Sequence, residues 1–382
     1  MSLKPRILSS AAEIEAEPWD ALANPDAARF NPFISHAFLW ALEKSGSATA
    51  RTGWAGSHLV LENNGKAVAA APCYVKSHSQ GEYVFDQGWA DAFERAGGRY
   101  YPKLQVSVPF SPVTACKLWA PTEALRGRLA SGLVSLCEAR GTSSVHVTFT
   151  REQDVEALTG QDWLPRHDIQ FHWHNEGYSC FDDFLAALSY SKRKTLRKER
   201  QAVRDQGVVL EALTGDDIKA HHWDHFWEFY MDTGSRKWGR PYLTRAFFEQ
   251  IHDTMRQHVL LVMAKHGERY IAGALNFIGG DTLYGRNWGC TENVPFLHFE
   301  TCYYQAIDFA IARKLKVIEA GAQGEHKLAR GYVPVKTQSF HHLAHAGLAR
   351  AVAHYLDQER AAIAAGQEEL AAHAPFRHTE QD

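Results

Sequence analysis

The chain has 382 residues, of which 45% are hydrophobic, 22% charged and 12% aromatic, and its formal net charge is −3. These values indicate a folded globular protein long enough for two domains, and they exclude a polyanion binder that works through bulk charge. No apolar run reaches the roughly 18–20 residues of a membrane helix, and residues 1–17 lack the apolar core of a secretory signal. The six cysteines form no C-x-x-C pair. Together these features favour the cytoplasm.

The first half of the chain predicts the order strand, strand, strand, helix, strand. The turn Asn63-Asn64-Gly65 between two apolar runs is a strong hairpin signal. Leucines at helical spacing predict the helix, with Gly141 at its C-terminal end. The expected elements are residues 57–62, 66–75, 82–85, 123–139 and 144–150.

An insertion over residues 86–112 interrupts this order and is rich in Trp, Tyr and Phe. One interpretation is a loop that covers the core. The other is a groove between the two halves that binds an acceptor, the substrate that receives a transferred group, because clefts between domains often bind ligands. In that case Tyr101 and Lys103 would contact the acceptor.

A basic helix is expected from Ser191, its N-cap, to Gly207. Seven of the residues from Ser191 to Arg204 are basic and one is acidic. A charge run of this kind is often a solvated face. However, carboxylate partners at i,i+4 are scarce, so the helix repels itself and could bind an anion. Arg193, Arg197 and Lys198 are the candidate phosphate contacts.

The second half repeats the element order of the first. Its expected elements are strands 259–265, 270–278 and 282–288, a helix over 297–314 and a strand over 316–320. The two halves show no visible sequence identity, so the repeat is one of architecture. We expect one domain over residues 1–160 and a second over residues 161–382, which carries the site.

The segment Gly321–Gly331 directly follows the last of these strands, where sites in α/β sheets are common. Its glycines allow unusual dihedral angles. Acyl transfer to an amine requires a base and groups that stabilise an oxyanion. Glu325 or His326 could be the base, and Lys327 or Arg330 could hold a phosphate or carboxylate. Gln323 is a further candidate for binding the substrate or donor. The alternative is that the whole segment is a polar surface loop.

Further candidates lie upstream, at the end of the third strand and the start of the helix. Arg286 and Asn287 end the strand, and His298 and Glu300 open the helix, whose N-terminus favours anions. For His298 and Glu300 a catalytic and a structural role are both open. The histidines at 221, 222 and 225 match no known pattern of metal ligands, and we expect no metal.

Three antiparallel strands, a crossing helix and a parallel return strand resemble the core of the GNAT acyltransferase fold. The chain therefore resembles a tandem of two GNAT-like domains, each an α/β (α+β type) unit with a mixed, mainly antiparallel sheet flanked by helices. The turn over residues 289–295 has a single glycine and an acid, unlike the glycine-rich pyrophosphate loop of acetyl-CoA enzymes.

Several segments resemble the FemABX family and, more closely, the bacterial FemAB-like group of N-acyltransferases. They are residues 191–208, 229–237, 100–103, 108–112 and 321–331, and the resemblance covers nearly the whole chain. FemABX enzymes add amino acids to peptidoglycan precursors and usually take them from aminoacyl-tRNA. The resemblance implies an acyltransferase and adds Arg236 and Lys237 to the candidate donor contacts.

The leading hypothesis is an N-acyl or aminoacyl transferase acting on an acceptor amine, in peptidoglycan precursor or related cell-envelope metabolism. We expect no tightly bound cofactor, and the acyl donor is aminoacyl-tRNA or acyl-CoA. The partners would be a small-molecule or peptide acceptor and a phosphate-bearing donor such as tRNA. Two alternatives remain: a non-catalytic module that binds tRNA or another polyanion, and a CoA-dependent N-acyltransferase of small metabolites.

Overall fold

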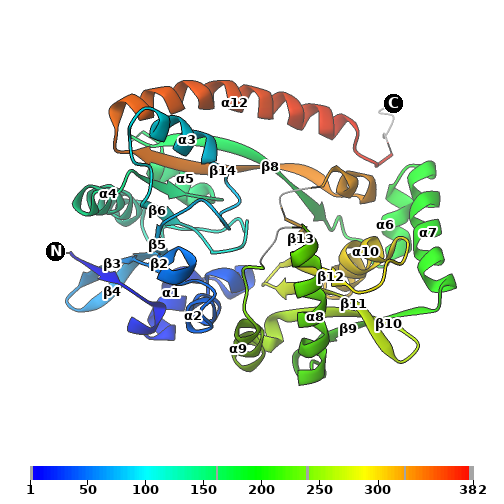
Figure 1. Cartoon of the computed structure of the whole chain (residues 1–382). Coiled ribbons are helices and arrows are strands. Elements are labelled where there is room, and N and C mark those ends of the chain that lie inside the picture. Colours follow the sequence, from blue (N-terminus) through cyan, green and yellow to red (C-terminus); the bar gives the residue numbers. More distant parts are fainter. Residues whose placement is uncertain (1–2, 161, 238–240, 322–323, 378–382) are drawn as a thin grey trace. The chain divides into compact units, whose positions relative to one another are not determined.

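The computed structural model describes residues 3–160, 162–237, 241–321 and 324–377, and it gives no side chains for residues 235–237 and 325. The chain divides into two compact units (Figure 1). The first consists of residues 1–26, 33–169 and 336–366, and the second of residues 27–32, 170–335 and 367–382. We describe each unit by itself.

The strands of the first unit are β1 (Lys4–Leu8), β2 (Trp54–Gly56), β3 (His58–Asn63), β4 (Lys66–Ala71), β5 (Cys73–Lys76), β6 (Lys103–Val106), β7 (Ser144–Val147) and, from Lys336 on, β14 (Val333–Leu343). Strands β1, β3 and β4 form an antiparallel sheet in that order. Strands β2, β5, β6, β7 and β14 form a second sheet, in which β6 and β7 are parallel. The hairpin between β3 and β4 turns at Asn64 and Gly65, whose φ angles are 51° and 76°, as a tight hairpin turn requires.

The helices of the first unit are α1 (Ala16–Ala23), α2 (His36–Lys44), α3 (Gln87–Arg95), α4 (Glu123–Arg140), α5 (Glu152–Leu158) and, up to Gly366, α12 (Ala346–Ala372). Helix α4 places Leu129, Leu133 and Cys137 in the main core, where they pack with Leu104 and Val145 of the sheet. Thr122 caps the helix at its N-terminus, and Gly141 ends it in the left-handed conformation.

The strands of the second unit are β8 (Leu164–His174) from Gln170 on, β9 (Val208–Thr214), β10 (Val259–His266), β11 (Arg269–Ile278), β12 (Thr282–Cys290) and β13 (Val317–Glu319). Their spatial order is β8-β13-β12-β11-β10-β9. All neighbours are antiparallel except β12 and β13, which are parallel.

The helices of the second unit are α6 (Phe181–Ala187), α7 (Tyr190–Asp205), α8 (Ala220–Lys237), α9 (Arg245–Met255), α10 (Leu297–Phe299), the π-helical turn η7 (Glu300–Tyr304), α11 (Gln305–Ala312) and the 3₁₀ helix η8 (Glu325–Arg330). Helix α8 packs on β11 and β12. A Cβ atom at Gly289 of β12 would lie 2.2 Å from the backbone oxygen of Phe229. The glycine that sequence analysis assigned to the turn after the strand therefore lies in β12, where it allows α8 to approach the sheet.

The structure confirms the expected order of strands and helix over residues 259–320 and corrects several other expectations. Residues 82–85 form no strand, and the expected strand 66–75 is divided into β4 and β5, which belong to different sheets. Strand β6 lies inside the segment expected to be an insertion. Helix α7 begins two residues earlier than expected, with Ser189 rather than Ser191 at its N-cap. The expected domain boundary lies at residue 160, whereas the compact units divide at residue 169 and both draw on the C-terminal segment.

Candidate active site

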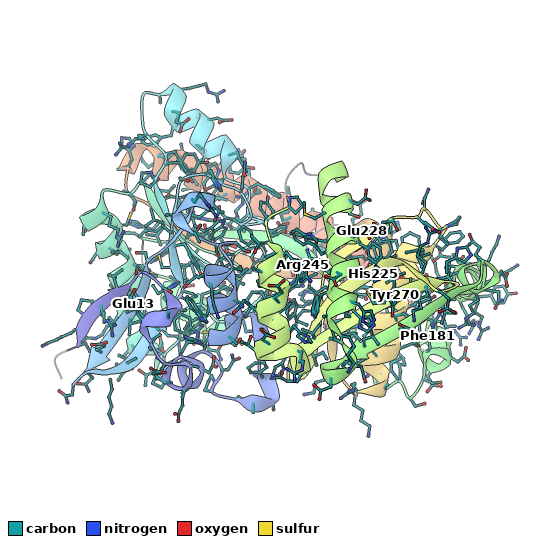
Figure 2. All side chains as sticks on the ribbon, turned by 60° about the horizontal axis from the view of Figure 1, so that its bottom comes forward. Glu13, Phe181, His225, Glu228, Arg245 and Tyr270 are labelled. Atoms are coloured by element: carbon teal, nitrogen blue, oxygen red, sulfur yellow. The ribbon has the colours of Figure 1, made fainter. Side chains whose placement is uncertain are left out.

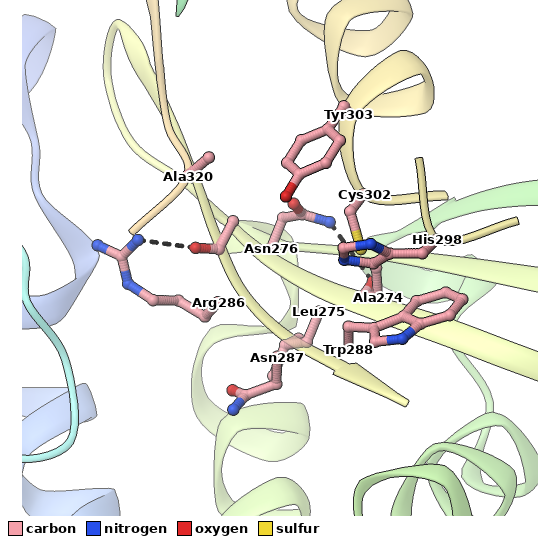
Figure 3. A pocket seen from close by; sticks show the side chains of 11 residues that line it. Ala274, Leu275, Asn276, Arg286, Asn287, Trp288, His298, Cys302, Tyr303 and Ala320 are labelled. Carbon is pink, nitrogen blue, oxygen red and sulfur yellow. Dashed lines mark hydrogen bonds between the residues drawn. The ribbon is translucent and has the colours of Figure 1, made fainter. Parts of the chain in front are cut away.

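A pocket of about 100 Å³ opens in the second unit where strands β12 and β13 separate (Figure 3). The two strands pair only from Thr282 to Tyr284. Strand β13 then ends at Glu319, whereas β12 continues to Cys290. The pocket is lined by Ala274, Leu275, Asn276, Gly285, Arg286, Asn287, Trp288, His298, Cys302, Tyr303 and Ala320. It therefore takes its walls from β11, β12, the end of β13 and the helix that follows β12.

A β-bulge places Arg286 at this pocket. Leu275 of β11 pairs with Asn287 and its neighbour Asn276 pairs with Gly285, so Arg286 is the extra residue of β12. Bulges re-aim side chains and are frequent beside active sites. The Arg286 guanidinium is buried; its Nη1 donates to the backbone oxygen of Gly285 at 2.8 Å, and its Nη2 lies 3.6 Å from Glu319 Oε2. A positive charge is thus fixed in the wall of the pocket.

The helix that follows β12 turns its first residues toward the pocket. It starts after Phe296, which has a φ angle of 66°, and it is π-helical from Glu300 to Tyr304. π-Helical turns inside α-helices are frequent at functional sites, and left-handed backbone in a non-glycine residue is a strained conformation. His298, Cys302 and Tyr303 line the pocket from this segment (Figure 3).

Tyr303 connects the pocket to His326. The Tyr303 hydroxyl and His326 Nε2 are 2.9 Å apart and share a hydrogen bond. Burial raises the pKa of Tyr303 well above its usual range, so the phenol stays protonated at neutral pH. His326 itself is exposed, and its ring lies 5.9 Å from that of His298, centroid to centroid. An imidazole open to solvent and a protonated phenol form a pair that can accept and relay a proton.

A buried lysine ties the loop that carries His326 to the residues that follow β13. Lys327 is buried, and its ammonium donates to the backbone oxygens of Ala320 at 2.6 Å and Gly321 at 3.1 Å. Burial, followed by repulsion from Arg286, lowers the pKa of Lys327 to about 8. Gly331 ends the 3₁₀ helix η8 with a φ angle of 86°. These contacts fix the loop to the end of β13.

Two buried ion pairs from helix α7 reach the same region. Arg330 Nη2 donates to both oxygens of Glu199, at 2.8 and 2.9 Å. Arg200 donates to Glu300 at 3.2 and 3.0 Å and to Asp308 at 2.6 Å. The predicted anion-binding residue Arg330 and the predicted catalytic residue Glu300 thus both have internal partners.

The remaining predicted residues of the second unit lie elsewhere or outside the described part. Arg193 is half-buried on α7, and Arg197 and Lys198 are exposed on the same helix. Arg197 pairs with Asp182 at 3.0 Å. Gln323 lies outside the described residues, as do the side chains of Glu325, Arg236 and Lys237.

Lys103 and Tyr101 belong to a buried polar network in the first unit. The Lys103 ammonium donates to Ser79 at 2.8 Å, to Glu82 at 2.7 Å and to Asp86 at 2.5 Å. The Tyr101 and Ser79 hydroxyls are 2.8 Å apart. Because the ammonium of Lys103 has an acceptor for each of its three protons, this network accounts for the side chain as a structural element.

The histidines of α8 make contacts of their own. His225 lies beside Tyr270 of β11, with ring centroids 5.1 Å apart (Figure 2). His222 Nε2 is 3.1 Å from the Tyr270 hydroxyl, which donates to Glu211 at 2.7 Å. Within the described ranges, no group of three His, Cys, Asp or Glu side chains is arranged to hold a metal ion. None of the helices in these ranges combines the length and the apolar composition of a membrane span.

Sequence reasoning singled out some of the residues that line this pocket and did not single out others. Arg286, Asn287 and His298 line one pocket, and His326 reaches it through Tyr303. Tyr303 and Cys302 lie within the helix expected over residues 297–314 and were not among the candidates, because regular α-helical spacing places both on its apolar face. The π-helical turn changes which residues of the helix face the pocket. The one hint in the sequence was that this segment follows the end of strand β12, a common place for functional residues.

Comparisons with known proteins identify a family and several similar folds. The model of the FemAB-like family, described as peptidoglycan biosynthesis/recognition, matches residues 10–378. Among solved structures, FemX is similar with a TM-score of 0.53 at 11% identity, covering 92% of this chain and 100% of that chain. The C-terminal domain of a putative lysylphosphatidylglycerol synthetase from Agrobacterium fabrum also has a TM-score of 0.53, at 9% identity, with 90% and 96% of the two chains covered.

A conserved protein of unknown function from Bacteroides thetaiotaomicron has a TM-score of 0.52 at 11% identity, with 88% of this chain and 99% of that chain covered. At these identities the likeness concerns the fold alone, and it confirms the expected α/β architecture of sheets flanked by helices. No curated protein sequence matches the chain at a significant level. The family match spans nearly the whole length, so the chain belongs to the FemAB-like family.

Proposed function

We propose that this protein is an N-acyl or aminoacyl transferase that works at the pocket between β12 and β13. The observation that carries the proposal is the Tyr303–His326 pair, which joins an exposed imidazole to a pocket with a fixed guanidinium. Membership in the FemAB-like family supports an activity in peptidoglycan or related cell-envelope metabolism.

The reaction follows from these groups. The acceptor amine attacks the acyl carbonyl carbon, forms the amide C–N bond and expels the oxygen or sulfur of the donor. His326 takes the amine proton, directly or through the Tyr303 hydroxyl, and a proton passes to the leaving atom. Arg286 stabilises the charge that develops on the carbonyl oxygen. One proton leaves the amine and one reaches the leaving group, so no further reactant is required.

The donor is an aminoacyl-tRNA or an acyl-CoA. Helix α7 supports a phosphate-bearing donor, because Lys194, Arg197 and Lys198 are exposed on it. Of its two acidic residues, Glu199 is buried and Asp205 is the last residue of the helix. Gly289 is used for packing against α8, so the turn after β12 has no glycine of its own for a pyrophosphate. These observations favour aminoacyl-tRNA over acyl-CoA.

The test is a panel of aminoacyl-tRNAs and acyl-CoAs with amine acceptors from peptidoglycan precursors, assayed with the wild type, His326→Gln and Tyr303→Phe. General acid–base catalysis contributes about 10²- to 10⁴-fold, so we expect His326→Gln to lower kcat by at least a hundredfold. Tyr303→Phe should lower kcat by less, because solvent can replace the relay. Full activity of both variants would overturn the proposed roles.

A second candidate function is a non-catalytic module that binds a polyanion through α7. It predicts tRNA binding that weakens steeply with salt and no acyl transfer with any donor of the panel. Turnover by the wild type with any donor excludes it.

A further inference from the structure

The buried face of helix α7 holds two charged residues that the proposed reaction does not use, Glu199 and Arg200. We propose that Glu199 is a positioning residue for the proton-relay pair Tyr303–His326. This inference rests on the proposed function, which makes the Tyr303–His326 pair a proton relay. The role of Glu199 follows from its own hydrogen bonds to the segments that carry the pair.

Glu199 bonds to both segments that carry the pair. One is the π-helical turn η7, whose Tyr304, the neighbour of Tyr303, donates its hydroxyl proton to Glu199 Oε2. The other is η8, through the paired bonds from Arg330 Nη2. The carboxylate therefore has a partner in each segment, and it is itself buried at 6% exposure.

Arg330 passes this constraint on to His326. Its second terminal nitrogen, Nη1, donates to the backbone oxygen of His326 at 2.7 Å. Its guanidinium also lies 3.3 Å from the centroid of the Phe299 ring, on the same helix as Tyr303. The guanidinium is thus held between the two segments, and its plane is set by the carboxylate that it faces.

The geometry of the relay depends on this arrangement. The Tyr303–His326 hydrogen bond joins η7 to η8, and two glycines, Gly321 and Gly324, precede η8 and make the backbone there easy to deform. Removing the Glu199 charge would leave Arg330 buried without its carboxylate, a strongly unfavourable state that the loop can relieve by moving. A displacement of about 1 Å at a catalytic group can cost about a hundredfold in rate.

Arg200, the next residue of α7, provides the matched control. It is buried to a similar degree and also makes ion pairs, but their partners, Glu300 of η7 and Asp308 of α11, lie outside η8. Arg200→Gln should therefore destabilise the protein as Glu199→Gln does, without acting on His326.

The first readout is independent of activity. The full-length protein is labelled with ¹⁵N-histidine, and the imidazole resonances of His326, assigned by their absence in His326→Gln, are followed as a function of pH. We expect Glu199→Gln to move the His326 resonances and titration in the same direction as Tyr303→Phe, and Glu199→Asp to restore them in part. In Arg200→Gln they should stay as in the wild type. An unchanged His326 titration in a folded Glu199→Gln protein would overturn the inference.

The second readout uses the donor found active in the panel. Glu199→Gln should lower kcat about 10- to 100-fold with little change in KM, and it should shift the limb of the pH–kcat profile that His326→Gln abolishes. An equal loss of kcat in Arg200→Gln would assign the effect to stability and contradict the inference. If His326→Gln is fully active, the proposed function fails, while the resonance experiment still decides whether Glu199 positions the imidazole.

Discussion

Replacing Gly331 with Ala tests how tightly the loop that carries His326 is packed. Gly331 has a φ angle of 86°, in the left-handed region, where an L-residue costs about 1–2 kcal/mol. A Cβ atom there would also lie 2.6 Å from Cζ and 2.7 Å from Cε2 of Phe184. Phe184 is fully buried and also contacts Trp173, so its ring has no solvent space to enter. Overpacking of this kind costs about 1–3 kcal/mol.

Gly321, in the same loop, is the matched control. Its φ angle is 79°, and a Cβ atom there meets nothing within 4 Å in the described part of the chain. Gly321→Ala should therefore cost the backbone term alone, and Gly331→Ala should lower the free energy of unfolding by about 1–3 kcal/mol more. Urea unfolding followed by far-ultraviolet circular dichroism measures both. Equal losses in the two variants would refute the packing argument.

Two further predictions concern buried charges. Glu300→Gln should lower the free energy of unfolding by about 1–3 kcal/mol, because Arg200 loses Glu300 and keeps its ion pair with Asp308. The kcat of this variant should stay within about threefold of the wild-type value. A hundredfold fall in kcat at unchanged stability would instead make Glu300 a catalytic residue. Burial lowers the pKa of Lys76 from 10.5 to about 7. The unfolded chain then binds more protons between pH 7 and 10.5, so this group makes unfolding less favourable as pH rises, by up to about 1.4 kcal/mol per pH unit. The stability of the wild type relative to Lys76→Met should increase over that range in urea titrations, and a difference that does not change with pH would contradict the assignment.

The sequence allowed prediction of those elements whose signals are local. The hairpin at Asn64-Gly65 and the meander from Val259 to Cys290 depend on turn residues and alternation, and both were predicted. Strand β6 was missed because Lys103 at its start reads as a surface residue. Its charge is compatible with burial only through Glu82 and Asp86, which lie 21 and 17 residues away.

For the candidate site, too, local signals could be read from the sequence and long-range contacts could not. Arg286 and His298 were found because they flank the end of a strand and the start of a helix, positions that sequence order reveals. The pairing of Glu199 with Arg330 joins residues 131 apart and depends on tertiary packing. The π-helical turn that presents Tyr303 depends on backbone hydrogen bonds that no periodicity in the sequence indicates.

The late return of the chain to its first unit has a consequence for biosynthesis. Strand β7 pairs with β14 from Val147 to Ser144 against Phe340 to Leu343. During translation, β7 must therefore wait for almost two hundred further residues before its partner leaves the ribosome, with one edge open to other strands. We expect nascent chains that stop before β14 to need a chaperone or to aggregate, and residues 1–160 alone to be a poor unit for expression.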